Sequence, residues 1–71
     1  MLNFNNTQEA IQYGLEHKGD MTAINKLRLF YSIMKLIAKE YAKKDEQVCL
    51  NILSKAQFIR EAMETAEGKP I

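Results

Sequence analysis

The sequence predicts an all-α fold, a bundle of three helices, and three observations support this prediction. Over most of the 71 residues, apolar side chains recur at steps of three and four, the spacing of one face of an α-helix. Gly19 and Gly68 stand where these patterns end, and glycine is a common residue just beyond a helix. The chain is short, so residues 1–71 are expected to form one domain, near the lower size limit for folding without disulfides, metal or oligomerisation.

A first helix is expected to begin near Thr7 and to end at about His17 or Lys18. Asn6 is followed three positions later by Glu9. In this pattern the two side chains bind free backbone amides at the start of a helix. The helix should therefore have a well-defined N-terminus.

The inner face of this first helix is expected to combine small and large apolar side chains. Its members are Ala10, Ile11, Gly14 and Leu15, with Tyr13 at the edge. A glycine in a helix interior costs about 1 kcal/mol relative to alanine, so Gly14 predicts either a close approach of another backbone or a weak helix. Residues 1–6 are expected to form an extended lead-in, with Leu2 and Phe4 packed against the bundle.

Residues 21–43 carry the longest apolar pattern and predict the helix around which the chain is organised. One stripe along it consists of Ile24, Leu27, Tyr31, Met34, Ala38 and Tyr41. A second stripe consists of Phe30, Ile33 and Ile37, and the apolar arc is widened by Leu29 and Leu36. Asp20, or failing that Thr22, should cap this helix, and the short turn before it predicts that the first two helices are antiparallel neighbours. The central helix is thus expected to pack between the other two.

A third helix is expected from Glu46 to about Ala66, followed by a short tail at residues 67–71. Its inner stripe consists of Cys49, Ile52, Ala56, Ile59, Met63 and Ala66. Around residues 43–46 the apolar pattern lapses, and lysines are followed by acids, as the dipoles at the end of one helix and the start of the next favour. No glycine or proline stands there. Two alternatives remain: a tight turn, or one continuous helix that would force packing between chains.

More apolar residues are present than a bundle of this size covers easily. The surplus on the second and third helices consists of Leu29, Ile33, Leu36, Leu50, Leu53 and Phe58. Contiguous apolar surface usually marks an interface, so these residues predict a homodimer or a site for a partner protein. The alternative is that the N-terminal segment and long lysine stems cover them.

The charge of the chain is unevenly distributed, although its net value is only +1. Residues 21–44 contain six basic residues and one acid, a balance of +5, and the remainder contains four basic and eight acidic residues, a balance of −4. Four cations of the central helix share one face at helical spacing: Arg28, Lys35, Lys39 and Lys43. This basic strip is either a solvated helix face, a site for an acidic protein, or a row of phosphate contacts for nucleic acid.

A helix-turn-helix motif is not expected, because the position that should be apolar in its second helix falls on Asp20. With one histidine and one cysteine the sequence offers no catalytic group, no metal site and no cofactor site. His17 is expected to interact with a helix dipole, and Cys49 to be a small core residue. These observations argue against an enzyme.

The setting expected from the sequence is cytoplasmic. A single cysteine is typical of a reduced, intracellular environment, and the N-terminus has no signal-peptide pattern. The central helix is long enough to cross a bilayer, but it contains charged residues such as Lys35 and Glu40, which argues against a membrane protein. The sequence therefore predicts a small interaction module, adaptor, regulator or inhibitor, acting as a homodimer through apolar surface; the alternative is a nucleic-acid-binding regulator that uses the basic strip.

Overall fold

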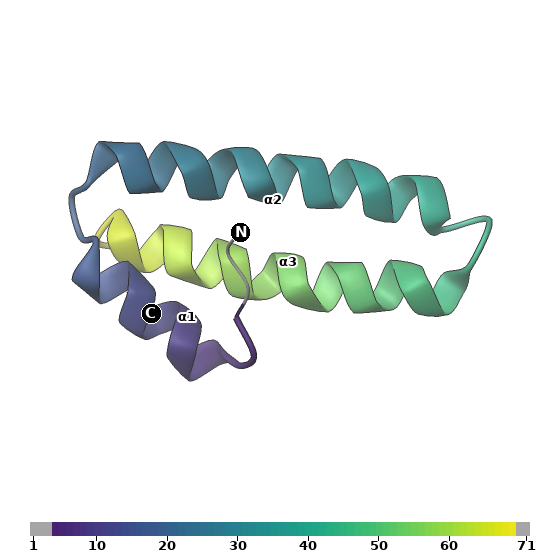
Figure 1. Cartoon of the computed structure of the whole chain (residues 1–71), viewed down its shortest axis with the longest axis horizontal. Helices are drawn as coiled ribbons and strands as arrows, with labels where there is room; N and C mark the ends of the chain where they lie inside the picture. Colours follow the sequence, from purple (N-terminus) through teal and green to yellow (C-terminus); the bar gives the residue numbers. More distant parts are fainter. Residues whose placement is uncertain (1–3, 70–71) are drawn as a thin grey trace.

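The computed structural model describes residues 4–69, in which the chain forms three helices. They are α1 (Thr7–Glu16), α2 (Met21–Tyr41) and α3 (Glu46–Ala66). α2 and α3 run antiparallel as a long hairpin, and the short α1 lies beside the C-terminal half of α3 (Figure 1). The Cα atoms extend over 38 × 22 × 20 Å. The prediction of an all-α bundle with a short first helix and two long ones is confirmed.

Each helix begins at a side chain that caps it. The Asn6 side chain accepts a hydrogen bond from the Glu9 amide at 2.9 Å, and the Glu9 carboxylate accepts one from the Asn5 amide at 2.8 Å. Asp20 caps α2 by accepting from the amides of Thr22 at 3.0 Å and Ala23 at 3.3 Å. These caps satisfy amides that have no partner within the helix, which explains why the N-terminal boundaries could be predicted.

α2 and α3 are separate helices, joined by a turn that contains no glycine. Asp45 accepts hydrogen bonds from the amides of Gln47 at 3.1 Å and Val48 at 3.3 Å and so caps α3. The amides of Lys44 and Asp45 donate to the carbonyl of Tyr41, at 3.0 and 2.8 Å, and close the end of α2. The tight turn, not the continuous helix, is therefore the correct alternative.

The order of packing differs from the prediction. α3, not α2, is the middle element, because it packs against both other helices, whereas no Cα atom of α1 lies within 8 Å of one in α2. The turn between α1 and α2 is tied to the end of α3 by a hydrogen bond of 2.9 Å from the Gly19 amide to the Ala66 carbonyl. This bond directs α1 along α3. The expectation that the first two helices are packed neighbours is wrong.

Small residues at the contact explain why α1 packs closely against α3. A Cβ atom on Gly14 would lie 2.6 Å from the carbonyl oxygen of Ala62 and 2.5 Å from the Cβ atom of Thr65. Ala10 and Ala62 are completely buried at the same contact. Glycine therefore allows the two backbones to approach closely, which confirms one of the two readings of Gly14 and gives its physical reason.

The core lies where the three helices meet. Its buried cluster consists of Phe4, Ala10, Leu27, Ile59 and Ala62, with Tyr13, Phe30, Tyr31, Met34, Phe58 and Met63 packed against it. Phe4 also meets the Tyr13 ring edge to face, with centroids 5.4 Å apart. The expected burial of Phe4 is confirmed, and Leu2 lies outside the described residues. Leu15 is exposed, contrary to the prediction, because α3 touches the narrow Ala10 and Gly14 side of α1.

Candidate functional site

An open groove runs between α2 and α3 in the half of the hairpin that leads to the Tyr41–Asp45 turn. Its volume is about 640 Å³. It is lined by Tyr31, Ser32, Lys35, Leu36, Ala38, Lys39, Ala42, Cys49 and Leu53. No carboxylate from the described part of the chain contributes to this lining, so the groove is apolar with a basic margin.

The groove is left open by small side chains and by the position of α1. Ala38 and Ala42 on α2 line it opposite Cys49 on α3, and these side chains fill little of the space between the helices. On α3, Cys49 and Leu53 stand on the opposite side of the helix from Ala62, which faces α1. α1 therefore covers the other side of the hairpin and leaves the groove uncovered.

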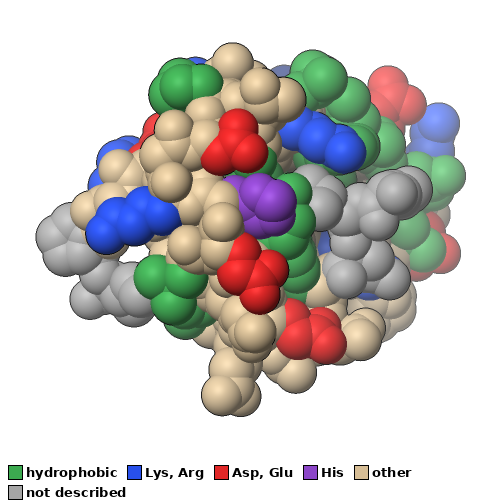
Figure 2. All heavy atoms as spheres, turned by 60° about the vertical axis from the view of Figure 1, so that its left-hand side comes forward, with side chains coloured by type: hydrophobic (Ala, Val, Ile, Leu, Met, Phe, Trp, Pro, Cys, Tyr) green, Lys and Arg blue, Asp and Glu red, His purple; other side chains and the backbone are tan. Residues whose placement is uncertain are grey.

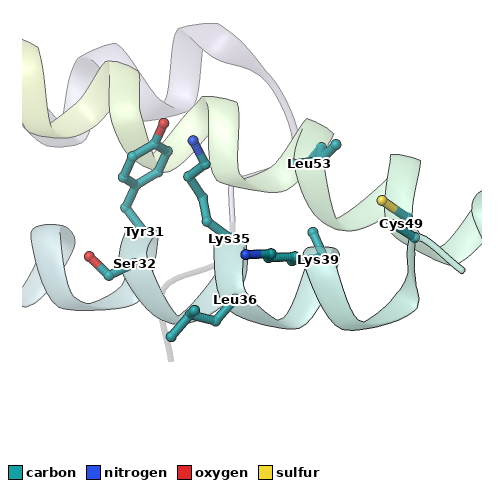
Figure 3. A pocket seen from close by; sticks show the side chains of 9 residues that line it. Tyr31, Ser32, Lys35, Leu36, Lys39, Cys49 and Leu53 are labelled. Carbon is teal, nitrogen blue, oxygen red and sulfur yellow. The ribbon is translucent and has the colours of Figure 1, made fainter.

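Lysine and tyrosine side chains form the margin of the groove. Figure 3 shows Lys35 and Tyr31 extending from α2 toward α3, and Leu36 pointing away from α3. The Lys35 ammonium lies 5.5 Å from the centre of the Tyr31 ring, within the range of a cation–π contact. The stem of Lys35 thus borders apolar surface while its charge stays at the rim.

The predicted interface residues divide into three groups. On α2, Leu29 is 60% exposed, Leu36 is 66% exposed and Ile33 is also exposed. On α3, Leu50 and Leu53 are exposed. Phe58 differs, because it is half-buried and packs against the core cluster, so it does not belong to the exposed apolar surface.

The exposed apolar residues form two surfaces, the outer face of α2 and the groove. The outer face of α2 is the side turned away from α3 and consists of Leu29, Ile33, Leu36 and Ile37, which is exposed to about the same extent as Ile33. Leu53 of α3 lines the groove, and Leu36 belongs to both the groove lining and the outer face. Leu50 lies on α3 outside the groove lining.

One cation of the predicted basic strip is already engaged within the chain. Arg28 forms an ion pair of 3.0 Å with Glu67 at the end of α3. Lys35, Lys39 and Lys43 are exposed, and helical spacing puts them on the same side of α2 as the groove. The strip available to a partner therefore has three lysines, of which Lys35 and Lys39 line the groove.

The opposite end of the molecule, where α1 leads into the turn to α2, carries His17. Figure 2 shows acidic side chains around the one histidine at this end. His17 is the C-cap residue of α1, and its Nδ1 atom lies 3.7 Å from the Asp20 carboxylate. Its ring also packs on Tyr13, with centroids 4.2 Å apart. His17 therefore lies among acidic side chains at the end of the bundle away from the groove.

The sequence predicted the exposed leucines but not the small residues that line the groove between the two helices. Ala38 and Cys49 were expected to be core residues. Ala38 is buried as expected and Cys49 is half-buried, and both also line the groove. The available signal was the small size of residues 38, 42 and 49 on both sides of the turn. Such residues leave a gap between two helices unless a third helix fills it.

Within residues 4–69 no three His, Cys, Asp or Glu side chains gather as a metal site would require, and none of the helices there is long and apolar enough to cross a membrane. Comparisons with protein-family models, with curated proteins and with solved structures gave no match for this chain. Its function is therefore inferred from its own geometry and chemistry.

Proposed function

We propose that this protein is a small protein–protein interaction module whose groove binds an amphipathic helix bearing acidic residues from another protein. It acts by burial and charge complementarity and carries out no catalysis. The observation that supports the proposal is the apolar groove between α2 and α3, in which Lys35 and Lys39 are the only charged lining residues among residues 4–69.

The shape of the groove suits a helix. A channel between two antiparallel helices accepts the apolar face of a third helix, which is a recurring mode of peptide recognition. Ala38, Ala42 and Cys49 would receive the apolar side chains of the ligand, and Leu36 and Leu53 would pack on either side of it. The ligand would then occupy the place of a third helix along this half of the hairpin.

The charge at the margin favours an acidic ligand. Lys35 and Lys39 line the groove, and Lys43 extends the row toward the turn. Carboxylates on the polar sides of a bound helix would complement these cations and would favour such a ligand over a basic one. A second copy of the chain docked groove to groove would instead bring the same lysines together, because an isologous contact places identical surfaces against each other.

Nucleic acid remains the second candidate, supported by the three exposed lysines in one row. It has less support than a helix, because Arg28 is held by Glu67 and the apolar Leu36 and Leu53 lie among the lysines. A phosphate backbone would leave these leucines without apolar contacts. Binding of duplex DNA or single-stranded RNA that falls steeply with salt would favour this candidate and contradict the helix.

The test uses a designed helical peptide of about 18 residues with leucines at helical spacing and glutamates beside them. We expect this peptide to bind more tightly than versions with glutamine or lysine in place of glutamate, and to shift the amide NMR signals of the groove residues. Leu53→Glu should weaken binding about tenfold or more, because it places a charge in the apolar lining.

Leu50→Glu is the matched control, since Leu50 is exposed on the same helix and does not line the groove. Its affinity for the peptide should equal that of the unmodified protein. Equal loss of binding in both variants, or signal shifts outside the groove, would contradict the proposal.

A further inference from the structure

The outer face of α2 is a second apolar surface, distinct from the groove. It consists of Leu29, Ile33, Leu36 and Ile37, all exposed along the side of the hairpin turned away from α3. Contiguous apolar surface of this kind usually marks an interface. Helical spacing separates most of it from Lys35 and Lys39, so a partner can cover it while the groove stays open.

Two opposite charges flank this surface symmetrically. Lys26 precedes Ile33 by seven residues and Glu40 follows it by seven, so both lie close to the Ile33 side of the helix. Each charge is about 10.5 Å from Ile33 along the helix axis, at 1.5 Å per residue. Both residues are exposed, and neither has an ion-pair partner within residues 4–69.

We propose that a second copy of the chain covers this face, with the two α2 helices antiparallel and the two-fold axis at Ile33. In that arrangement Ile33 of each copy meets Ile33 of the other, and Leu29 faces Ile37. Lys26 of each copy lies opposite Glu40 of the other, so one symmetric contact forms two ion pairs. A parallel arrangement would place Lys26 against Lys26 and Glu40 against Glu40. These like-charge contacts would destabilise it.

This inference goes beyond the proposed function, because it concerns a different side of α2 and a different partner. The two surfaces share Leu36 at their common edge. The test therefore leaves Leu36 unchanged and uses the charges, which are exposed and contribute nothing to the core.

The experiment measures molecular mass by sedimentation equilibrium over a wide range of protein concentrations. The unmodified chain should approach twice the mass of one chain. Lys26→Glu and Glu40→Lys, each alone, should weaken dimerisation by about 5- to 30-fold, because each substitution replaces two exposed ion pairs with two like-charge contacts. Far-UV circular dichroism should be unchanged in both.

Restoring the complementarity should restore the dimer. The double variant Lys26→Glu, Glu40→Lys exchanges the charges and should dimerise as the unmodified chain does. An equimolar mixture of the two single variants should form a heterodimer, since one copy then carries two acids and the other two lysines at the contact. Lys55→Glu is the control for Lys26→Glu, because both substitutions lower the net charge by two and Lys55 is an exposed site on α3.

A monomer at every concentration would overturn the inference, as would single variants that dimerise like Lys55→Glu or a double variant that fails to recover. Leu53→Glu, which alters the groove, should leave the dimer mass unchanged. Loss of peptide binding with an intact dimer, or the reverse, therefore separates the proposed function from this inference.

Discussion

At the scale of single residues, Gly14 decides how closely α1 approaches α3. Its position next to the Ala62 carbonyl leaves no room for a Cβ atom. In an isolated helix, alanine would be better than glycine by about 1 kcal/mol. The packing requirement therefore outweighs a local preference of the chain, and the weaker helix former is the residue that allows the fold.

Gly14→Ala should lower the free energy of unfolding by about 1–2 kcal/mol. The added methyl group meets a backbone oxygen, which cannot rotate away as a side chain would, and overpacking of this kind costs about 1–3 kcal/mol. The gain in helix propensity offsets only part of this cost. Urea denaturation measures the change, and Gln8→Ala, at an exposed site in the same helix, should alter stability by less than about 0.5 kcal/mol. A more stable Gly14→Ala variant would show that α1 can move away from α3 without loss.

At the scale of helices, the sequence predicts boundaries well because caps are local. Asn6, Asp20 and Asp45 each satisfy amides two or three residues away, so a short window of sequence contains the whole signal. The packing order is not local. It depends on Gly14 meeting Thr65, far along the chain, and on the Gly19 amide reaching the end of α3, and neither contact leaves a periodic pattern.

Asp45→Ala should lower the free energy of unfolding by about 1 kcal/mol, because two amides of the first turn of α3 lose their acceptor. Asp45→Asn keeps a side-chain oxygen in place and should cost much less. Urea denaturation of both variants checks this prediction. Small-angle scattering adds a second check: a continuous helix over residues 21–66 would be about 69 Å long, against a longest Cα extent of 38 Å in the folded bundle. An unchanged stability in Asp45→Ala would show that the turn does not depend on this cap.

At the scale of the whole molecule, the two ends of the bundle are built differently. At one end three helices enclose a core around Leu27 and Ile59. At the other end α2 and α3 are the only helices formed by residues 4–69, and the groove runs between them. The exposed leucines beside the groove could be predicted from the surplus of apolar residues, but its depth depends on which side of α3 receives α1. The side of α3 that receives α1 is determined by contacts at the opposite end of the molecule. The sequence near the groove therefore does not predict how deep the groove is.

Local stability should follow this difference. Amides near Leu27 and Ile59 should exchange their hydrogens roughly 100-fold more slowly than those of residues 39–41 and 50–53. The latter lie in the distal half of the hairpin, the half that contains the groove, and opening this half exposes few buried apolar contacts. Hydrogen exchange followed by NMR measures these rates. Adding the acidic helical peptide should slow exchange mainly in the distal half, since the ligand takes the place of the missing third helix. Uniform protection in the free protein would mean that both ends are packed equally tightly, and the distal half would then offer no open groove for a partner.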